Sequence, residues 1–412
     1  MQSRERKLDP EKRKTTWKEV SLGLTEEEAV EEAKRCIKCT NPLCAQTCPT
    51  TQQIPLFVRS IVDGELERAL EIIIQDNPFP ITTGKVCPAF CEKRCVLGAK
   101  GEPIRIRLLK RYVAEHADFS KVNIESKPST GNRVAVIGSG PSGLSAAFYL
   151  SKQGHDVTVF ERFKMPGGML YYGIPSYRLP KSSLGKEIEL IKKAGVKIET
   201  LHEIKDPKEL TERFDAVYVS AGAWAPRKMG IPGEERALEA VNFLFDVNSG
   251  KEVGVGKNTI VVGGGNVAID AARASLRLGA DSVRIVYRRT RNEMPADPRE
   301  VQGAEEEGVE LMFLTNPVEI SEGKIRLVKM ELGEPDESGR ARPVPVQGSE
   351  FEIDADTVIM AVGQVPEKID IDSEKVFAGG DFVSGPSTVV QALADGKIKA
   401  RAISKYLSRP SP

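Results

Sequence analysis

The pattern of hydrophobic and polar positions predicts two regions of different architecture. Up to about residue 117, apolar residues recur at the spacing of amphipathic helices. From residue 133 onward, short β-branched runs alternate with helical patterns, which is typical of parallel α/β sheets. Residues 118–131 are polar and have no clear periodicity, so they are the best candidate for a linker between the two regions.

Several helices are expected in the first region. Thr25 and Glu28 have the spacing of a capping box, ahead of an acidic amphipathic run that ends near Cys36 and Cys39. Further helices are expected at 56–62, 65–75 and 104–115.

Two segments of the second region resemble each other about 125 residues apart. Each has the order strand, glycine-rich turn, helix, strand, at 133–137, 138–143, 144–154 and 156–160, and again at 259–262, 263–268, 269–278 and 282–287. This order predicts two nucleotide-binding units.

The overall charge and the apolar runs exclude two classes of protein. The chain has 59 Lys plus Arg and 59 Asp plus Glu among 412 residues, so no net field attracts nucleic acid. The longest apolar stretches fall far short of the roughly 20 residues that a membrane span requires.

Residues 1–20 are rich in Lys and Arg, but acidic residues are interspersed and no apolar segment follows, unlike a signal or transit peptide. Two interpretations of residues 1–20 remain: a solvated tail, and a segment that docks a partner. Without export the protein is expected in the cytoplasm, where clustered cysteines bind metal or do redox chemistry more often than they form disulfides.

The first glycine turn, Gly138, Gly140 and Gly143, has the G-x-G-x-x-G spacing between a strand and a helix. Such a turn lets a pyrophosphate approach the helix N-terminus. Glu161 ends the following strand, 23 positions after Gly138, where a carboxylate accepts hydrogen bonds from ribose hydroxyls.

The second turn contains Gly263, Gly265 and Ala268, the G-x-G-x-x-A variant of the same motif. Its second strand ends before Arg288 and Arg289 instead of in a carboxylate. Arginine at this place suits the 2′-phosphate of NADP, with a solvated surface pair as the alternative interpretation.

A third glycine-rich segment lies near the C-terminus. Gly379, Gly380 and Asp381 follow a short apolar run and precede a helical stretch. The glycines allow a close approach of the backbone to a ligand, and Asp381 suits a ribityl hydroxyl. With the first unit, this segment predicts a two-part FAD site interrupted by an inserted NADP unit.

All seven cysteines lie in the helical region, at Cys36, Cys39, Cys44, Cys48, Cys87, Cys91 and Cys95. Their density, with proline after two of them, is typical of iron-sulfur ligation. Structural zinc is the competing interpretation, since paired C-x2-C units also suit tetrahedral zinc. Because no cysteine follows Cys95, a flavin in the second region has no nearby dithiol, and the cysteine region is the alternative exit for its electrons.

Together these motifs resemble the small subunit of NADPH-dependent glutamate synthase and its relatives. The likeness extends to Gly167-Gly168-Met169, to the stretch from Tyr172 to Pro180, and to Tyr287-Arg288-Arg289-Thr290. The relatives include the large subunit of bifurcating ferredoxin:NADP oxidoreductases and the N-terminal half of dihydropyrimidine dehydrogenase. In the family, the segment like 167–180 lies by the flavin ring.

The resemblance implies two interleaved [4Fe-4S] clusters. Cys36, Cys39, Cys44 and Cys95 would hold one, while Cys48, Cys87 and Cys91 would hold the other with a fourth ligand of another kind. Relatives place Gln or Glu at a position that corresponds here to Lys110, which is not a suitable ligand. Glu102 could substitute; otherwise the second cluster would be labile, water-ligated or three-iron.

The expected fold is therefore α/β: a helical iron-sulfur domain at 1–125, followed by two Rossmann-like domains. The FAD domain takes 131–245 and 363–412, and the NADP domain at 246–362 interrupts it. The expected positions for FAD are Gly138, Gly140, Pro141, Ser142, Gly143, Glu161, Gly167, Gly168, Ile174, Arg178, Gly222, Gly363, Gly380, Asp381, Ser387 and Thr388. The expected positions for NADP are Gly263, Gly265, Asn266, Val267, Ala268, Arg288 and Arg289.

The expected function is transfer of hydride from NADPH to FAD and of single electrons through the clusters to a larger catalytic subunit or a ferredoxin-like partner. Flavins convert a two-electron donor into a one-electron donor. No catalytic side chain is expected. Two alternatives remain: a self-sufficient oxidoreductase that reduces ferredoxin, polysulfide or a dye, and a non-catalytic metal-binding assembly protein.

Overall fold

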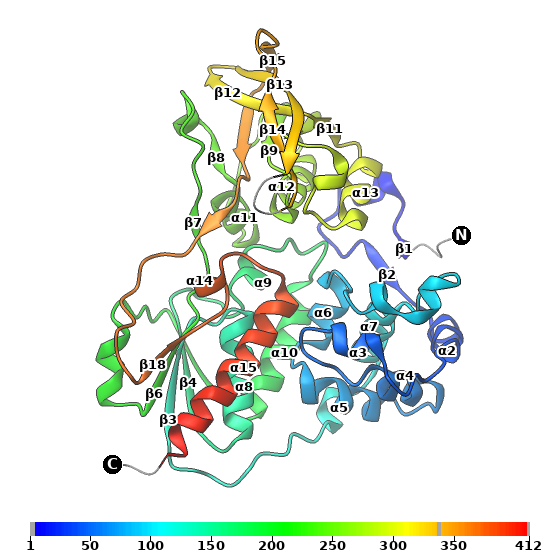
Figure 1. Cartoon of the computed structure of the whole chain (residues 1–412), viewed down its shortest axis with the longest axis vertical. Coiled ribbons are helices and arrows are strands. Elements are labelled where there is room, and N and C mark those ends of the chain that lie inside the picture. The colour runs from blue at the N-terminus through cyan, green and yellow to red at the C-terminus, as the bar shows by residue number, and fades with distance from the viewer. Residues whose placement is uncertain (1–4, 336–338, 410–412) are drawn as a thin grey trace.

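The structure is a computed structural model that describes residues 5–335 and 339–409. Figure 1 shows an upper lobe, the second α/β domain, above a lower lobe in which the first α/β domain and the helical domain lie side by side. The expected architecture is confirmed, with two separate parallel sheets after a helical domain.

The helices expected at 56–62, 65–75 and 104–115 are present as α4, α5 and α7. Each end of these helices lies within two residues of the predicted end. In α5, Ala69, Leu70 and Ile73 are buried along one face, which packs the helix into the core. The helices are α1 Pro10–Arg13, α2 Glu26–Lys34, α3 Leu43–Thr47, α4 Ile54–Val62, α5 Leu66–Asp76, α6 Pro80–Val86 and α7 Ile106–His116. Short 3-10 turns lie at Glu92–Arg94, Val96–Ala99 and Phe119–Lys121.

The first α/β domain has a five-stranded parallel sheet in the order β18-β6-β3-β4-β5. Its strands are β3 Arg133–Ile137, β4 Asp156–Glu161, β5 Lys197–Thr200, β6 Ala216–Val219 and β18 Val376–Ala378. Its helices are α8 Pro141–Lys152, α9 Met169–Tyr172, α10 Lys181–Lys193, α14 Asp381–Ser384 and α15 Val389–Leu407. The chain thus returns to this sheet after the second domain, as the interrupted arrangement requires.

The second α/β domain has a five-stranded parallel sheet in the order β11-β10-β9-β16-β8. Its elements are β8 Leu238–Glu239, α11 Ala240–Asn248, β9 Asn258–Val262, α12 Asn266–Arg277, β10 Ser282–Tyr287, α13 Pro298–Glu306, β11 Glu310–Phe313 and β16 Thr357–Met360. The second α/β domain was expected to begin at residue 246. Strand β8 lies before this boundary, yet it pairs with β16 and belongs to the sheet of the second domain. The short strands β7 Ala225–Pro226 and β17 Gln364–Val365 pair where the chain crosses between the domains.

An antiparallel sheet that the sequence analysis did not predict covers the second domain. Its strands are β12 Thr315–Ser321, β13 Lys324–Pro335, β14 Ala341–Pro345 and β15 Phe351–Asp354. Ile325 and Leu327 of β13 are fully buried against β9 and β16 residues, so the sheet closes one side of this domain's core.

The helical domain and the first α/β domain share one continuous hydrophobic core. At their junction Glu187 of α10 accepts hydrogen bonds from the backbone N–H groups of Ile81 (2.6 Å) and Thr82 (3.0 Å), in the first turn of α6. Burial raises the pKa of Glu187 to about 8, against the effect of these hydrogen bonds. The two domains therefore form a single packed unit.

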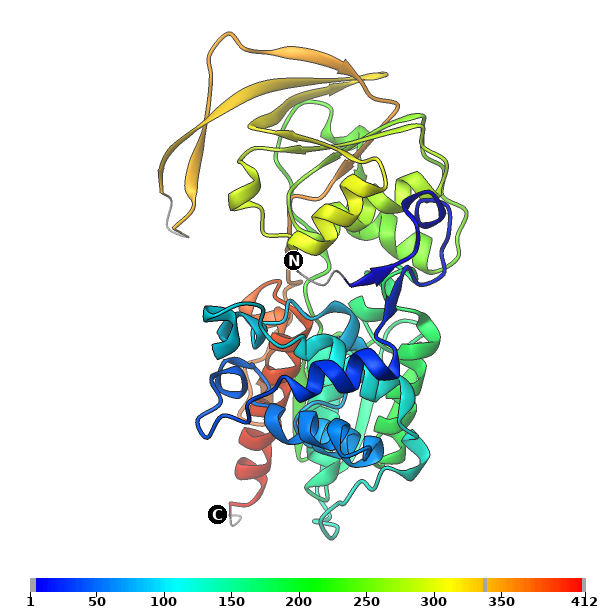
Figure 2. The ribbon, with the colours of Figure 1, turned by 90° about the vertical axis from the view of Figure 1, so that its right-hand side faces the viewer.

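The N-terminal segment is not a solvated tail, so that interpretation is wrong for residues 5–20. This segment, with β1 Arg6–Lys7 and β2 Ser21–Gly23, crosses between the two lobes in Figure 2. Arg13 is 2% exposed and pairs with Glu306 of α13 at 2.6 Å, and Trp17 packs on Tyr177 with ring centroids 6.1 Å apart. An ion pair made by a buried arginine and a contact between two rings thus hold the segment in place.

Within the described residues, no helix is long and apolar enough to cross a membrane.

Candidate functional site

A large pocket opens at the carboxyl ends of the strands of the first α/β domain, where open parallel sheets bind ligands. It is lined by the ends of β3 and β4, by the segment after β6 and by the starts of α14 and α15. Of the residues expected to bind FAD, those that line this pocket are Gly138, Gly140, Pro141, Ser142, Glu161, Gly168, Ile174, Gly222, Asp381, Ser387 and Thr388.

The glycine turn is tight at two of its three glycines. Gly138 has φ +94°, and a Cβ there would lie 2.6 Å from the carbonyl oxygen of Ser220. At Gly143 a Cβ would lie 2.0 Å from the carbonyl oxygen of Gly138. The helix after the turn, α8, begins at Pro141, three residues earlier than expected, so its N-terminus lies at the pocket and favours a phosphate.

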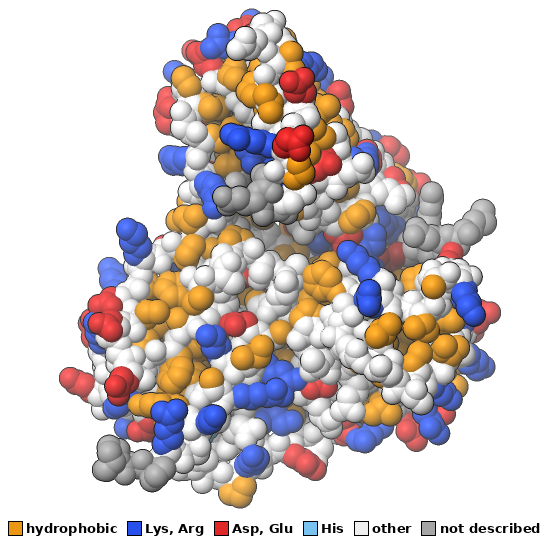
Figure 3. Space-filling model, in the orientation of Figure 1, with side chains coloured by type: hydrophobic (Ala, Val, Ile, Leu, Met, Phe, Trp, Pro, Cys, Tyr) orange, Lys and Arg blue, Asp and Glu red, His pale blue; other side chains and the backbone are white. Residues whose placement is uncertain are grey.

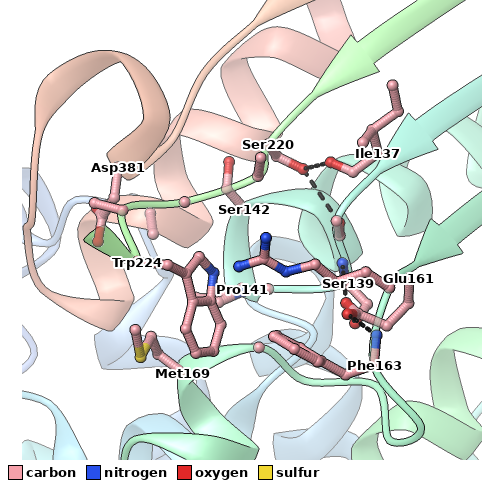
Figure 4. Close-up of a pocket in the computed structure, with 18 of the residues that line it drawn as sticks. Ile137, Ser139, Pro141, Ser142, Glu161, Phe163, Met169, Ser220, Trp224 and Asp381 are labelled. Atoms are coloured by element: carbon pink, nitrogen blue, oxygen red, sulfur yellow. Dashed lines mark hydrogen bonds between the residues drawn. The ribbon is translucent and has the colours of Figure 1, made fainter. Parts of the chain in front are cut away.

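Glu161 is buried and held from two sides (Figure 4). Its Oε2 accepts hydrogen bonds from the backbone N–H and the hydroxyl of Ser139, the former at 3.0 Å, and its Oε1 accepts one from the N–H of Phe163 at 2.8 Å. The carboxylate has about four lone-pair sites, two on each oxygen, so Oε1 keeps acceptor capacity for a ligand hydroxyl.

Asp381 lies across the pocket from Glu161 (Figure 4). Its Oδ1 accepts hydrogen bonds from the hydroxyl and the N–H of Ser387, at 2.6 and 3.2 Å. Burial raises the pKa of Asp381, against the effect of these bonds. Ser387, just before α15, thus fixes the carboxyl group of Asp381.

An apolar wall lines the same pocket, and of its residues the family resemblance had indicated only Met169. Phe163, Met169 and Trp224 project into it, and the rings of Phe163 and Trp224 lie 5.1 Å apart (Figure 4). The guanidinium of Arg162 lies 4.7 Å from the Phe163 centroid and pairs with Glu367 at 3.1 Å. A flat, apolar ring system suits such a wall, and no local motif marks Phe163 or Trp224.

Five positions that were expected at the FAD site do not line the pocket: Gly143, Gly167, Arg178, Gly363 and Gly380. Arg178 lies elsewhere, in ion pairs with Asp270 (2.6 Å) and Glu300 (3.0 Å) of the second domain. Burial raises the pKa of Asp270 to about 6, although Arg178 opposes this effect. Arg178 therefore joins the two α/β domains.

The second glycine turn also begins with a glycine of positive φ close to a backbone carbonyl. Gly263 has φ +142°, and a Cβ there would lie 2.3 Å from the carbonyl oxygen of Ala361. Gly265 caps α12, which includes Asn266, Val267 and Ala268. The N-terminus of this helix is thus available for a phosphate.

The two arginines after β10 differ in their surroundings. Arg288 is exposed. Arg289 is 3% exposed, and its Nε donates a hydrogen bond to the carbonyl oxygen of Ala341 at 2.8 Å. The second arginine is therefore part of the packing between the parallel sheet and β14.

The seven cysteines divide between two cavities. The first is lined by Cys36, Cys39, Cys44 and Cys95, and the second by Cys48, Cys87 and Cys91. This is the division that the interleaved arrangement implies. Ile106 of α7 lines both cavities, so they are neighbours.

No three described His, Cys, Asp or Glu side chains converge on the position of a single metal ion. In a [4Fe-4S] cluster each cysteine binds a different iron, so its ligands need only line a common cavity. Burial raises the pKa of Cys44 to about 11 and that of Cys91 well above its ordinary value. These thiols are therefore protonated at neutral pH until a metal replaces the proton.

The fourth-ligand candidates lie in different places. Lys110 lines the cavity of the three cysteines, as does Gln52, which the sequence analysis did not consider. Glu102 lines another cavity, together with Glu92 and Arg105. Glu102 is therefore not placed to complete the second cysteine group.

Sequence comparison matches residues 13–122 to the family described as dihydropyrimidine dehydrogenase domain II, 4Fe-4S cluster. Residues 132–396 match the pyridine nucleotide-disulphide oxidoreductase family. The second match alone covers more than half of the chain.

Curated relatives cover nearly the whole chain. The beta subunit of NADP(+)-dependent formate dehydrogenase from Moorella thermoacetica is 39% identical over 88% of this chain, which spans 60% of that relative. The small chain of NADPH glutamate synthase from Escherichia coli is 33% identical over 97% of both chains. Among solved structures, FprA from Mycobacterium tuberculosis has a TM-score of 0.57 at 22% identity, over 68% of this chain and 87% of FprA, and shows the fold alone.

The two family matches divide the chain as the structure does, into a cysteine-rich helical domain and a pair of α/β domains. Several of these relatives are named as beta subunits or small chains, so those proteins are parts of larger enzymes. The chain belongs to the family of NADPH-dependent flavin and iron-sulfur oxidoreductases that includes the small chain of glutamate synthase.

Proposed function

We propose that this chain takes hydride from NADPH at an FAD in the large pocket and delivers single electrons through two iron-sulfur clusters to a partner protein. When bound, the flavin supplies the exchange between two-electron and one-electron chemistry. The residues of the chain bind and orient the groups, and none is required as an acid, base or nucleophile.

The observation that carries this proposal is the order of the three sites. Val389 lines the large pocket, and Val390 lines the cavity of Cys48, Cys87 and Cys91. Ile106 then separates that cavity from the cavity of the other four cysteines. Nucleotide pocket, second cysteine group and first cysteine group therefore follow one another through the lower lobe.

The chemistry of the pocket supports FAD. The α8 N-terminus favours a pyrophosphate, Glu161 suits ribose hydroxyls and the apolar wall with Trp224 suits a ring system. Asp381 at the start of α14 suits a ribityl hydroxyl. The second α/β domain would bind NADPH, with the exposed Arg288 as the partner of the 2′-phosphate.

The first cysteine group lies where a partner could approach. Cys36, Cys39, Cys44 and Cys95 are partly exposed, unlike the three buried cysteines of the second group. Around them Ile37 is 60% exposed, Leu56 50% and Val96 38%, and Figure 3 shows hydrophobic side chains gathered on this face over α3. We expect the electron acceptor to dock on this surface, named here the α3 surface. The clustered thiols suit a reducing compartment, so we expect the protein to work in the cytoplasm.

The identity of the acceptor differs among the relatives, whose names include glutamate synthase, formate dehydrogenase and NADPH-Fe(3+) oxidoreductase subunits. We propose a larger catalytic subunit of an enzyme of this kind as the partner. A ferredoxin-like acceptor would make the chain self-sufficient, and reduction of added ferredoxin by the NADPH-reduced protein would support this alternative.

The proposal is tested by anaerobic mixing of the purified protein with NADPH. Flavin absorbance should bleach first, and iron-sulfur absorbance should then fall without another protein. If NADPH reduces the flavin but only dithionite reduces the clusters, the route from pocket to cysteines is wrong. Zinc in place of iron would leave the protein as a flavin enzyme with a structural metal site.

A further inference from the structure

The second cysteine group needs one more ligand. Cys48, Cys87 and Cys91 line one cavity, so three of the four irons of a [4Fe-4S] cluster would have a thiolate. This inference rests on the proposed function, because it concerns the cluster that this cavity would hold.

Of the residues that line this cavity, three besides the cysteines carry a nitrogen or oxygen in the side chain: Gln52, Arg107 and Lys110. Arg107 has no lone pair to offer, and its guanidinium donates to the carbonyl oxygens of Gly84 (2.9 Å) and Lys85 (3.1 Å). Lys110 carries an ammonium group, which donates hydrogen bonds and accepts none. Gln52 alone of these three has a neutral carbonyl oxygen.

A tight turn brings Gln52 back to the first cysteine of the group. Thr51 has φ +56°, an uncommon conformation for a residue with a side chain, and its N–H donates to the carbonyl oxygen of Cys48 at 2.8 Å. The hydroxyl of Thr50 lies 3.3 Å from the sulfur of Cys48. Residues 48–52 thus wrap around one edge of the cavity.

The side chain of Gln52 is 2% exposed, and its hydrogen bonding is incomplete. Its amide nitrogen has one long hydrogen bond, to the carbonyl oxygen of Ile73 at 3.5 Å. None of the described residues donates a hydrogen bond to its amide oxygen. An iron ion in the cavity that Gln52 lines would give this oxygen a partner.

We propose that the side-chain oxygen of Gln52 ligates the iron that the three thiolates leave open. An amide oxygen binds iron without losing a proton, so only the charge of three thiolates is added to this cluster. The ammonium of Lys110, in the same cavity, compensates part of that charge. Gln52 thereby takes the place of the oxygen donor that relatives have at the position of Lys110.

The test uses the whole chain, reconstituted anaerobically with iron and sulfide, in the variants Gln52→Ala and Gln53→Ala. Gln53 is the matched control, because it directly follows Gln52 in the chain and its side chain is exposed. The wild type and Gln53→Ala should each hold about eight irons per chain. After one-electron oxidation with ferricyanide, Gln52→Ala should release one iron as Fe2+ and keep about seven, with the electron paramagnetic resonance signal of an oxidised three-iron cluster. After brief exposure to air, Gln52→Ala should fall to about four irons with normal flavin content.

A third variant, Gln52→Cys, distinguishes ligation from support of the loop. A thiolate at this position should keep about eight irons and resist air better than the wild type. Full iron in Gln52→Ala, or equal loss in Gln52→Ala and Gln52→Cys, would overturn the assignment of Gln52. A wild type that takes up no iron at all would instead contradict the proposed function.

Discussion

Val389 and Val390 are consecutive residues at the start of α15, yet the first lines the nucleotide pocket and the second lines the cavity of three cysteines. The two sites therefore lie on adjacent faces of the first turn of α15. Lys397, further along the same helix, donates to the carbonyl oxygen of Thr50 at 3.1 Å and pairs with Asp76 at 2.6 Å. These contacts fix α15 against the loop that carries Cys48.

The first prediction concerns the choice of nucleotide. Arg288→Ala should lower kcat/KM for NADPH about tenfold to a hundredfold and leave NADH unchanged, since a charge-assisted bond is worth about 1.5–3 kcal/mol. Arg284→Ala is the control, because Arg284 lies on β10, the strand that precedes Arg288, and pairs with Glu310. Equal losses with both nucleotides would contradict a contact to the 2′-phosphate. Arg289→Ala should instead lower the melting temperature, because Arg289 is buried.

The second prediction concerns retention of the flavin. Gly138→Ala should weaken FAD binding at least about tenfold, because φ is +94° and the new methyl group would meet the carbonyl oxygen of Ser220. FAD released on denaturation measures the effect. Gly185→Ala is the control: it lies inside α10 with nothing within 4 Å, and it should stabilise the protein by about 0.5–1 kcal/mol.

The third prediction concerns pH and the junction of the helical and first α/β domains. Because burial raises the pKa of Glu187 to about 8, the folded protein binds this proton more tightly than the unfolded chain. The contribution of Glu187 to stability is therefore complete below the unfolded pKa of about 4.5 and is lost as the pH rises through about 8. The melting temperature of Glu187→Gln should fall less than that of the wild type between pH 5 and about 8. Glu189→Gln, on the exposed face of the same helix, should follow the wild type.

The fourth prediction concerns the α3 surface. Ile37→Asp should raise KM for the protein acceptor about fivefold or more, since a buried contact in an interface is worth about 1 kcal/mol, and should not affect reduction of a small dye. Leu332→Asp, in the upper lobe and 37% exposed, should change neither rate. An equal loss of dye reduction in Ile37→Asp would indicate damage to the cluster instead of docking.

Local patterns predicted the parts of the site that depend on backbone geometry. The turns at Gly138 and Gly263 were located because only glycine allows the chain to pass so close to Ser220 and Ala361. The two cysteine groups followed from the family resemblance, and each group lines one cavity of the structure. The start of α8 was placed three residues late because Pro141 had been assigned to the turn.

Features that depend on tertiary contacts could not be predicted from the sequence. Phe163 and Trp224 are far apart in the chain and meet only after β4 and β6 pair with β3. Gln52 has no motif of its own and becomes a candidate ligand only through its cavity. The sheet β12–β15 lies outside the repeated units, and its strands were not assigned from their pattern.

The N-terminal segment has a consequence for the order in which the protein forms. Its contacts include Arg13 with Glu306 and the backbone of Thr16 with Arg277, residues that leave the ribosome long after the segment itself. Synthesis proceeds at about 5–20 residues per second. At this rate the partners in the second domain are made roughly 15 to 60 seconds after the N-terminal segment, and the pairs cannot form earlier. Buried arginines would meanwhile be in water, and the two lobes would not yet be tied. Closure of this segment is therefore a late step of folding, and a ribosome-bound chain that stops before residue 277 should remain open to protease near its start.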